Sequence, residues 1–181
     1  LIDTAGVRRR GKVFETAEKF SVVKTLQAIE IAHVVILMLD AVEGLSEQDL
    51  RLLGHVIDSG RALVIAVNKW DAVGRTQREE VERESDRRLR FVDYATVRTI
   101  SAVRGQGLGQ LMRAVDGAWQ AANKKFATSE LTRILGDAVE QHPPPIVKGR
   151  RIKLRYAHQA GSNPPRIVIH GSQTDAVPAS Y

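Results

Sequence analysis

Short apolar runs alternate with patterns of helical spacing over the first two thirds of the chain. Runs at residues 34–39 and 63–67 are rich in β-branched residues and predict buried parallel strands, and residues 96–100 predict a third strand. Helices are predicted over residues 16–31, from Ser46 to Gly60, over the charged segment 77–90, and along a face of Leu108, Leu111, Met112, Val115 and Trp119. Strands that alternate with helices indicate βαβ units, so we expect an α/β fold with a mostly parallel sheet and flanking helices.

Two of the predicted helices carry local signals. Asp49 follows Ser46 by three residues, a spacing that caps the start of a helix. The charged helix holds two pairs of opposite charge at i, i+4 spacing, Glu79 with Arg83 and Glu84 with Arg88. Such pairs indicate a solvent-exposed helix rather than a binding site.

The pattern changes near residues 123–127, which divides the chain into a larger domain (1–124) and a smaller one (125–181). A helix capped by Thr128 or Ser129 is predicted next, ended by the prolines at 143–145. Residues 150–156 and 166–170 then alternate like two strands. Alternation predicts one face of Arg151, Lys153 and Arg155, and an opposite face of Ile152, Leu154 and Tyr156.

Composition narrows the classes of function. The chain has 181 residues, with 27 Lys and Arg against 21 Asp and Glu, and no cysteine. The lack of cysteine excludes disulfides and cysteine-ligated metals and suits a reducing cytosol. No apolar run approaches the roughly 20 residues that span a bilayer, so we expect no membrane contact. The smaller domain holds 8 basic against 4 acidic residues, which leaves a polyanionic partner and a solvated basic surface as equal alternatives.

The segment Asn68-Lys69-Trp70-Asp71 carries the clearest chemistry. It directly follows the predicted strand at 63–67, and open α/β sheets bind ligands at the carboxyl ends of their strands. Guanine presents two adjacent donors, its ring N–H and its exocyclic amine, and the Asp71 carboxylate can accept both. Adenine lacks that ring N–H, so the carboxylate favours guanine by roughly 1.5–3 kcal/mol per hydrogen bond. Lys69 can lay its aliphatic stem along the base, and Asn68 can tie neighbouring loops together.

Two other strand ends carry weaker motifs. Asp3, with Gly6 three residues later, suits a carboxylate that holds Mg²⁺ directly or through water and a backbone N–H that approaches a terminal phosphate; taken alone, an ordinary turn fits better. Ser101-Ala102 suits a backbone N–H near the guanine carbonyl, or a tight turn. Because all three motifs follow strands of one parallel sheet, we expect them to converge at one crevice.

In this order the motifs resemble those of the P-loop GTPases. The resemblance implies a P-loop NTPase-type sheet, in which Asp3 binds Mg²⁺ through water and Gly6 senses the γ-phosphate of GTP. It also implies a guanine-binding role for Asn68, Lys69 and Asp71, buttressed by Ser101 and Ala102.

The chain departs from the P-loop GTPase pattern in two places. No Gly-x-x-x-x-Gly-Lys-Ser/Thr occurs, so the resemblance implies that the phosphate loop lies upstream of Leu1, and we expect no tight GTP binding by these 181 residues alone. Val7 stands where many relatives have a glutamine that orients the attacking water. Hydrolysis would therefore need another group, such as a bound monovalent cation or a partner residue; Arg8–Arg10 suit a basic surface loop better than that role.

Longer segments resemble the second GTPase domain and the C-terminal KH-like domain of the EngA/Der family. They include residues 18–22, 44–49, 68–71, 131–134, 149–158 and 163–165. Members of this family are bacterial tandem GTPases that assist late assembly of the large ribosomal subunit. The resemblance implies a cytoplasmic, monomeric GTPase that uses GTP/GDP and Mg²⁺ and contacts rRNA. It also implies that the chain lacks the first GTPase domain, the start of the second, and the last helix and strand of a truncated KH-like domain.

The smaller domain leaves two interpretations open. The predicted stripe of Arg151, Lys153 and Arg155 suits RNA phosphates, or an ion-paired interface with the GTPase domain. The Gly-x-x-Gly clamp of ordinary KH modules is missing from residues 125–181, so docking on the ribosome by shape and charge is favoured over sequence-specific binding of single strands. The alternative function is a non-catalytic RNA-binding or scaffolding module with a GTPase-like shell.

Overall fold

The computed structural model describes residues 2, 15–147 and 149–181. The predictions for Asp3, Gly6, Val7 and Arg8–Arg10 therefore lie outside the described residues. The chain divides into two compact units, the first ending at Ala122 and the second spanning Asn123–Tyr181.

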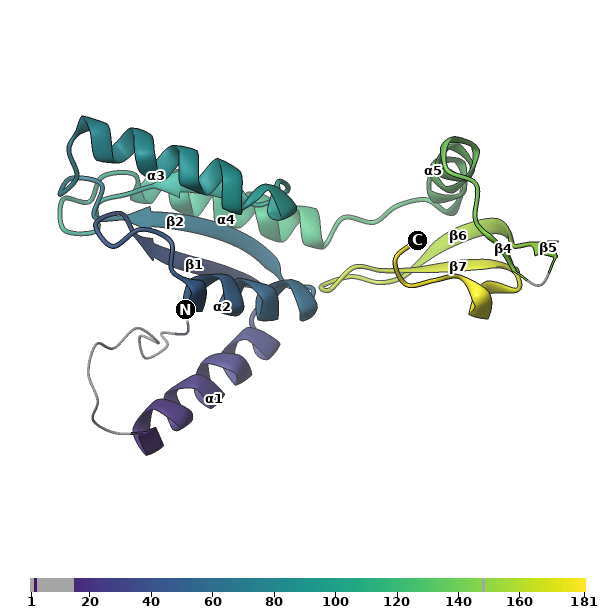
Figure 1. The fold of residues 1–181 in the computed structure, drawn as a ribbon, viewed down its shortest axis with the longest axis horizontal. Coiled ribbons are helices and arrows are strands. Elements are labelled where there is room, and N and C mark those ends of the chain that lie inside the picture. The colour runs from purple at the N-terminus through teal and green to yellow at the C-terminus, as the bar shows by residue number, and fades with distance from the viewer. Residues whose placement is uncertain (1, 3–14, 148) are drawn as a thin grey trace. The chain divides into compact units, whose positions relative to one another are not determined.

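The first unit is built on a three-stranded parallel sheet (Figure 1). Its strands are β1 (Val34–Asp40), β2 (Ala62–Asn68) and β3 (Thr96–Thr99), which lie side by side in that order. Asp40 pairs in register with Asn68, and Val67 pairs with Thr99, so the carboxyl ends of all three strands reach the same edge of the sheet. The predicted α/β fold with a parallel sheet is confirmed.

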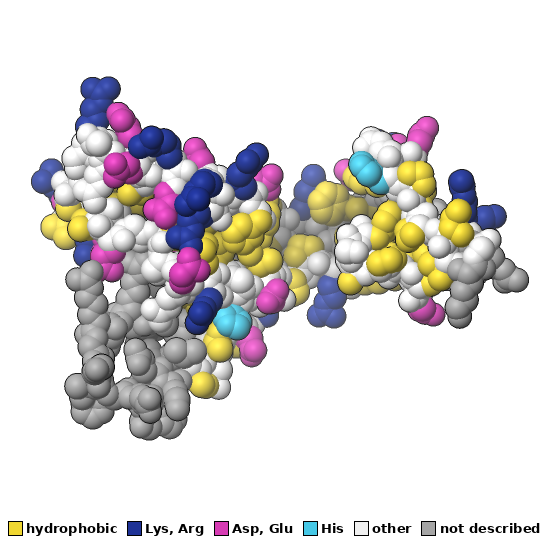
Figure 2. Space-filling model, viewed as in Figure 1, with side chains coloured by type: hydrophobic (Ala, Val, Ile, Leu, Met, Phe, Trp, Pro, Cys, Tyr) yellow, Lys and Arg dark blue, Asp and Glu magenta, His cyan; other side chains and the backbone are white. Residues whose placement is uncertain are grey.

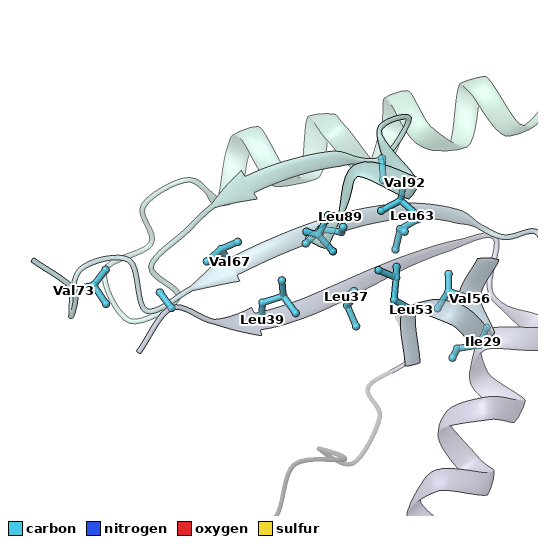
Figure 3. Packing of buried hydrophobic residues seen from close by; sticks show 13 residues of the cluster. Ile29, Leu37, Leu39, Leu53, Val56, Leu63, Val67, Val73, Leu89 and Val92 are labelled. Carbon is cyan, nitrogen blue, oxygen red and sulfur yellow. The ribbon is translucent and has the colours of Figure 1, made fainter. Parts of the chain in front are cut away.

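Strand β2 is buried on both faces, which explains its continuous apolar sequence. Residues Leu63–Val67 are each no more than 3% exposed. Leu63, Ile65 and Val67 pack in one cluster with Leu53 and Val56 of helix α2 (Glu47–Asp58) and Ile29 of helix α1 (Glu15–Ile31) (Figure 3). On the opposite face, Val64 and Ala66 pack against Leu111 of helix α4 (Leu108–Ala122). Cores on both sides hold the end of β2 in place.

Helix α3 (Arg75–Arg88) has no buried residue, as its charged sequence predicts. Figure 2 shows basic and acidic side chains interleaved over it. The Glu84–Arg88 pair is present at 3.3 Å. The predicted pairing of Glu79 with Arg83 is wrong: the Glu79 carboxylate contacts Arg75 at 3.2 Å, and Arg83 donates to the main-chain carbonyl of Glu79. The chain then enters a short 3-10 helix, η1 (Arg90–Val92).

Helix starts follow the sequence prediction in one case and not in the other. Ser46 caps α2 as predicted, because its Oγ accepts from the Asp49 N–H at 3.2 Å while the Asp49 carboxylate accepts from the Ser46 N–H at 2.9 Å. Helix α5 (Thr128–Gln141) begins one residue early, with Ala127 at the cap position and no side-chain cap bond. The prediction that Thr128 or Ser129 caps this helix is therefore wrong.

The predicted inner face of α4 is only partly right. Leu111 is buried, but Met112 and Trp119 are 52% and 49% exposed. The residues of α4 that pack on the sheet are Leu111, Ala114, Val115 and Ala118. Small alanines let the helix approach the sheet closely, and a search for large apolar residues overlooks them.

In the second unit, α5 packs on an antiparallel hairpin. The hairpin consists of β6 (Lys153–Gly161) and β7 (Arg166–Ser172), and a smaller pair consists of β4 (Ile146–Val147) and β5 (Arg150–Arg151), with a 3-10 helix η2 (Thr174–Ala176) after β7. The Thr132 hydroxyl of α5 accepts from the Ala157 N–H at 3.3 Å and donates to the Ala157 carbonyl at 3.4 Å. The strand predicted over residues 150–156 is thus two strands, interrupted at the buried Ile152.

A register shift in β6 corrects the predicted faces of this strand. Pairing with β7 skips Arg155, because Leu154 pairs with Gly171 and Tyr156 with His170. A residue added in this way reverses the inside-to-outside alternation beyond it. Tyr156 is 44% exposed and Ala157 is 2% exposed, so Tyr156 lies on the exposed side with Arg155 rather than on the inner side.

Candidate functional site

The loop after β2 is held in an unusual conformation. Lys69 has a φ of 62°, the left-handed region that side-chain-bearing residues seldom adopt. The Trp70 N–H donates to the Ile100 carbonyl at 3.0 Å, and the Ala72 N–H donates to the Lys69 carbonyl at 2.9 Å. These bonds turn the chain sharply at the end of β2 and join the loop to the end of β3.

A side-chain hydrogen bond joins the loops after β2 and β3. The Asn68 Oδ1 accepts from the main-chain N–H of Ala102 at 3.0 Å. The loop after β3 is closed by mutual backbone bonds between Ser101 and Gln106, at 3.0 and 3.1 Å. Asn68 therefore fixes the position of the Ser101-Ala102 segment relative to the Asn68–Asp71 segment.

Asp71 is positioned by the loop after β3. Its side chain is 19% exposed, and its Oδ2 lies 3.3 Å from Nε of Arg104. A hydrogen bond with the buried Ser101 hydroxyl holds the pKa of Asp71 below its ordinary value; partial burial opposes this, and the charges of Arg104 and Arg78 assist it. The hydrogen bond and the nearby cations favour the anionic form of Asp71, whose two carboxylate oxygens are hydrogen-bond acceptors.

Asp40, at the end of β1, is a member of this site that sequence reasoning missed. Its Oδ2 lies 2.7 Å from the Lys69 ammonium, and its Oδ1 accepts from the Val42 N–H at 2.9 Å. Burial acts to raise the pKa of Asp40, but the hydrogen bonds from Lys69 and Val42 outweigh it and the pKa is lowered. The available signal was an acidic residue at the end of a buried strand that pairs directly with Asn68.

Arg78 was also missed, because it belongs to the charged helix. Its guanidinium carbon lies 5.5 Å from the centre of the Trp70 ring, and its Nη2 donates to the Trp70 carbonyl at 2.8 Å. A cation over an aromatic face at this separation is attractive. The contact anchors the Asn68–Asp71 loop to the start of α3 and adds positive charge near Asp71.

Gly107 joins the Ser101-Ala102 loop to α4. Its φ is 78°, and a Cβ there would lie 2.5 Å from the Thr99 carbonyl oxygen and 3.0 Å from the Ile100 side chain. The Leu111 N–H donates to the Gly107 carbonyl at 2.9 Å, so α4 begins at once. A glycine is required here because any side chain would push α4 away from the strand end.

The structure brings together five of the predicted nucleotide-site residues: Asn68, Lys69, Asp71, Ser101 and Ala102. Asp3 and Gly6 lie outside the described residues. Among residues 2, 15–147 and 149–181, no group of three or more His, Cys, Asp or Glu side chains is arranged to hold a metal ion. No helix within the same residues is both long enough and apolar enough to cross a bilayer.

A cavity of the first unit lies beside this site rather than in it. Its volume is about 550 Å³. It is lined by residues of α3, η1 and β3, such as Thr99, together with Leu89 and with Trp70 from the loop after β2. Asn68, Asp71 and Ala102 are not among its lining residues. The candidate site is instead the edge of the sheet, where the three strand ends and their loops meet.

Comparisons with known proteins agree with this division of the chain. Residues 18–121 match the model of the elongation factor Tu GTP-binding domain, and residues 125–181 match that of the KH-domain-like C-terminus of EngA bacterial GTPase enzymes. The whole chain is 60% identical to the GTPase Der of Hahella chejuensis and 61% identical to that of Azotobacter vinelandii. It spans 38% and 37% of the length of these curated relatives.

Solved structures share the fold at low identity. Era in complex with MgGDPNP and a segment of 16S ribosomal RNA has a TM-score of 0.55 and 20% identity, covering 93% of this chain and 59% of that one. The elongation factor SelB of Methanococcus maripaludis, in complex with a GTP analogue, has a TM-score of 0.52 and 17% identity, covering 60% and 24%.

The parallel sheet, the Asn68–Asp71 loop and the matched model define a GTP-binding domain of the elongation factor Tu type. A KH-like domain follows it. The chain belongs to the EngA/Der family of GTPases.

Proposed function

We propose that this chain supplies the guanine-reading half of a GTP-binding and GTP-hydrolysing protein that acts in late assembly of the large ribosomal subunit. The observation that carries the proposal is the Asp71 carboxylate, hydrogen-bonded with Ser101 at the edge of the sheet where β2 and β3 end. A guanine ring N–H and exocyclic amine would donate to Asp71. A main-chain N–H of the Ser101-Ala102 segment, which Asn68 holds in place, would lie near the guanine carbonyl.

Lys69 has a distinct role in this proposal. Its ammonium is held by Asp40 at 2.7 Å, while its side chain remains 55% exposed. The aliphatic stem is therefore stretched along the edge of the sheet, where it can cover one face of a base. Ser101 and Ala102 complete the site through the Asp71 hydrogen bond and the bond to Asn68.

The phosphate half of the site is assigned by family resemblance. Asp3 would bind Mg²⁺ through water, and Gly6 would approach the γ-phosphate of GTP. A glycine-rich phosphate loop is absent from the 181 residues, so by themselves they are expected to bind GTP weakly. In place of the glutamine that Val7 replaces, a monovalent cation or a partner residue would assist hydrolysis. The GTPase domain would comprise residues 1–124 and the KH-like domain residues 125–181.

The test compares Asp71→Asn with the unchanged protein, at the full length of the curated relatives and in the presence of Mg²⁺. Loss of a hydrogen bond to a charged group predicts a fall in GTP affinity of about 10- to 150-fold, with ATP affinity unchanged. Asp58→Asn, an exposed carboxylate at the end of α2, is the control. Unchanged preference for GTP over ATP in the Asp71 variant would refute the proposed role of Asp71.

The second unit would provide the contact with ribosomal RNA. Arg151, Lys153 and Arg155 are all exposed, and the unit carries a net charge of +4 over residues 125–181, from 8 basic and 4 acidic side chains. The alternative is a scaffold that binds RNA without using nucleotide. RNA affinity that changes between the GTP-bound and GDP-bound forms supports the GTPase; indifference to nucleotide supports the scaffold. The protein would act as a cytoplasmic monomer.

A further inference from the structure

Three rings form a row across the β6–β7 hairpin. The Tyr156 and His170 rings are stacked with centroids 4.3 Å apart and planes 8° from parallel. His158 continues the row, with its ring centroid 5.0 Å from that of His170 and its Nδ1 3.2 Å from His170 Nε2. Tyr156 and His170 face each other in the antiparallel pairing, so the strands themselves align these rings.

The row lies on the face of the hairpin opposite the buried side chain of Ala157. Helix α5 bonds to the main chain of Ala157 through Thr132, and the Ala157 side chain, which is 2% exposed, is buried on one face of the hairpin. Successive residues of a strand point to opposite faces, so Tyr156 and His158 project to the face opposite the buried Ala157 side chain. Tyr156 keeps 44% exposure although His170 covers one face of its ring. A planar group could therefore stack on the other face of Tyr156 and extend the row.

Three basic residues lie on the same side of the hairpin as this row. Lys153 and Arg155 are exposed on β6, and alternation along β7 places the exposed Arg166 on the same side as His170. Among the residues that the structure describes, no ion pair joins these three side chains to a carboxylate. The register shift at Arg155 puts this cation next to Tyr156 on the exposed side, as their exposure shows.

We propose that the Tyr156–His170–His158 row is a stacking platform for the bases of single-stranded RNA, with Lys153, Arg155 and Arg166 contacting the phosphates. Unpaired bases stack on aromatic and histidine rings, whereas paired bases within a helix are unavailable for this contact. Stacking tolerates any base, because every base has a π-face. Binding by this mode needs no Gly-x-x-Gly clamp, which residues 125–181 lack. The inference rests on the proposed contact of this unit with RNA and specifies its residues.

The experiment measures fluorescence anisotropy of a labelled 12-nucleotide oligoadenylate and a 12-base-pair RNA duplex with the whole chain. Tyr156→Ala is expected to weaken binding of the single strand by about 5- to 150-fold, with little change for the duplex. Tyr156→Phe keeps the π-face and should restore affinity. Tyr94→Ala, an equally truncated exposed tyrosine of the first unit, is the control.

A second readout separates stacking from charge. Arg155→Ala is expected to reduce the slope of log affinity against log salt by about 0.7, the value for one phosphate of a single strand, whereas Tyr156→Ala should leave the slope unchanged. Circular dichroism confirms that each variant is folded.

Single-strand affinity that is unaffected in a folded Tyr156→Ala variant would overturn the platform. If Arg155→Ala still weakened binding, RNA contact by this unit would stand. If neither RNA bound at 50 mM salt, the platform and the proposed RNA contact would both fall. The GTP test with Asp71→Asn is independent of all three outcomes.

Discussion

The side chain of Asn68 and the backbone of Ala102 are joined by a hydrogen bond of 3.0 Å, although 34 residues separate them in sequence. The bond links the end of β2 to the loop after β3. It positions Asp71 relative to the loop that carries Ser101, the residue whose hydroxyl lowers the pKa of Asp71. The geometry of the site is thus set by an amide that need not contact the ligand.

Replacing Asn68 by alanine removes this link. We expect a loss of about 0.5–1.5 kcal/mol in the free energy of unfolding, because one hydrogen bond is lost and the Ala102 N–H can turn to water. The Ala102 amide should also exchange faster with solvent. Urea denaturation and hydrogen exchange measure both effects, with Gln110→Ala, on the exposed side of α4, as control. Unchanged exchange at Ala102 would contradict the role given to Asn68.

Gly107→Ala tests the close approach of α4 to β3. The added Cβ would meet the Thr99 carbonyl oxygen at 2.5 Å in a backbone with φ of 78°. Strain of this kind costs about 1–3 kcal/mol, so the midpoint of urea denaturation should fall. Gly117→Ala is the matched control, because nothing lies within 4 Å of its Cβ position in the same helix. That variant should stabilise the protein by about 0.5–1 kcal/mol.

Ser46→Ala removes the capping box of α2. The expected loss is about 1 kcal/mol of unfolding free energy, since the Asp49 N–H loses its acceptor and the Asp49 carboxylate loses the hydroxyl donor. Ser129→Ala in the first turn of α5 should cost little, because that helix has no side-chain cap bond. Thermal denaturation of the two variants decides between the cap seen in the structure and the cap expected from sequence. Equal losses would contradict the assignment of Ala127 as the cap.

Asp40 and Asp71 both have a pKa lowered by folding, which makes stability depend on pH in the acid range. A carboxylate with a depressed folded pKa stabilises the protein above its unfolded pKa of about 3.9 and loses that contribution as the pH falls through the folded value. The protein should therefore lose stability below about pH 4.

Asp40→Asn should make this loss shallower, and Lys69→Met should do the same from the other side of the pair. Chemical denaturation at pH 6 and pH 3 supplies the comparison. An equally steep loss in both variants would show that the Asp40–Lys69 contact does not contribute.

Strand β2 was predictable because it lies between cores on both faces and is therefore continuously apolar. The short apolar sequence of residues 63–67 predicted a buried strand, and the helices between the strands predicted a parallel arrangement. The exposed helix α3 was equally clear from its charged sequence. The faces of α4 were less so, because Ala114 and Ala118 give no hydrophobic signal although they contact the sheet.

The candidate site was predictable only in part. Asn68, Asp71 and Ala102 follow strands and lie on loops that the parallel sheet must bring together. The contribution of Asp40 depends on strand register, and that of Arg78 depends on how a charged helix lies over Trp70. Neither relation is encoded by local spacing. The exposure of Tyr156 was mispredicted because one extra residue at Arg155 reverses the strand alternation, and no composition signal marks it.

The left-handed backbone of Lys69 has a consequence for engineering. A lysine held there is less favourable than glycine by roughly 1–2 kcal/mol, since its Cβ crowds the following carbonyl oxygen. Directed evolution for heat resistance alone would therefore tend to put glycine at this position and discard the ammonium that reaches Asp40. A heat-resistant variant of this protein should therefore be selected for ligand binding as well as for thermal stability.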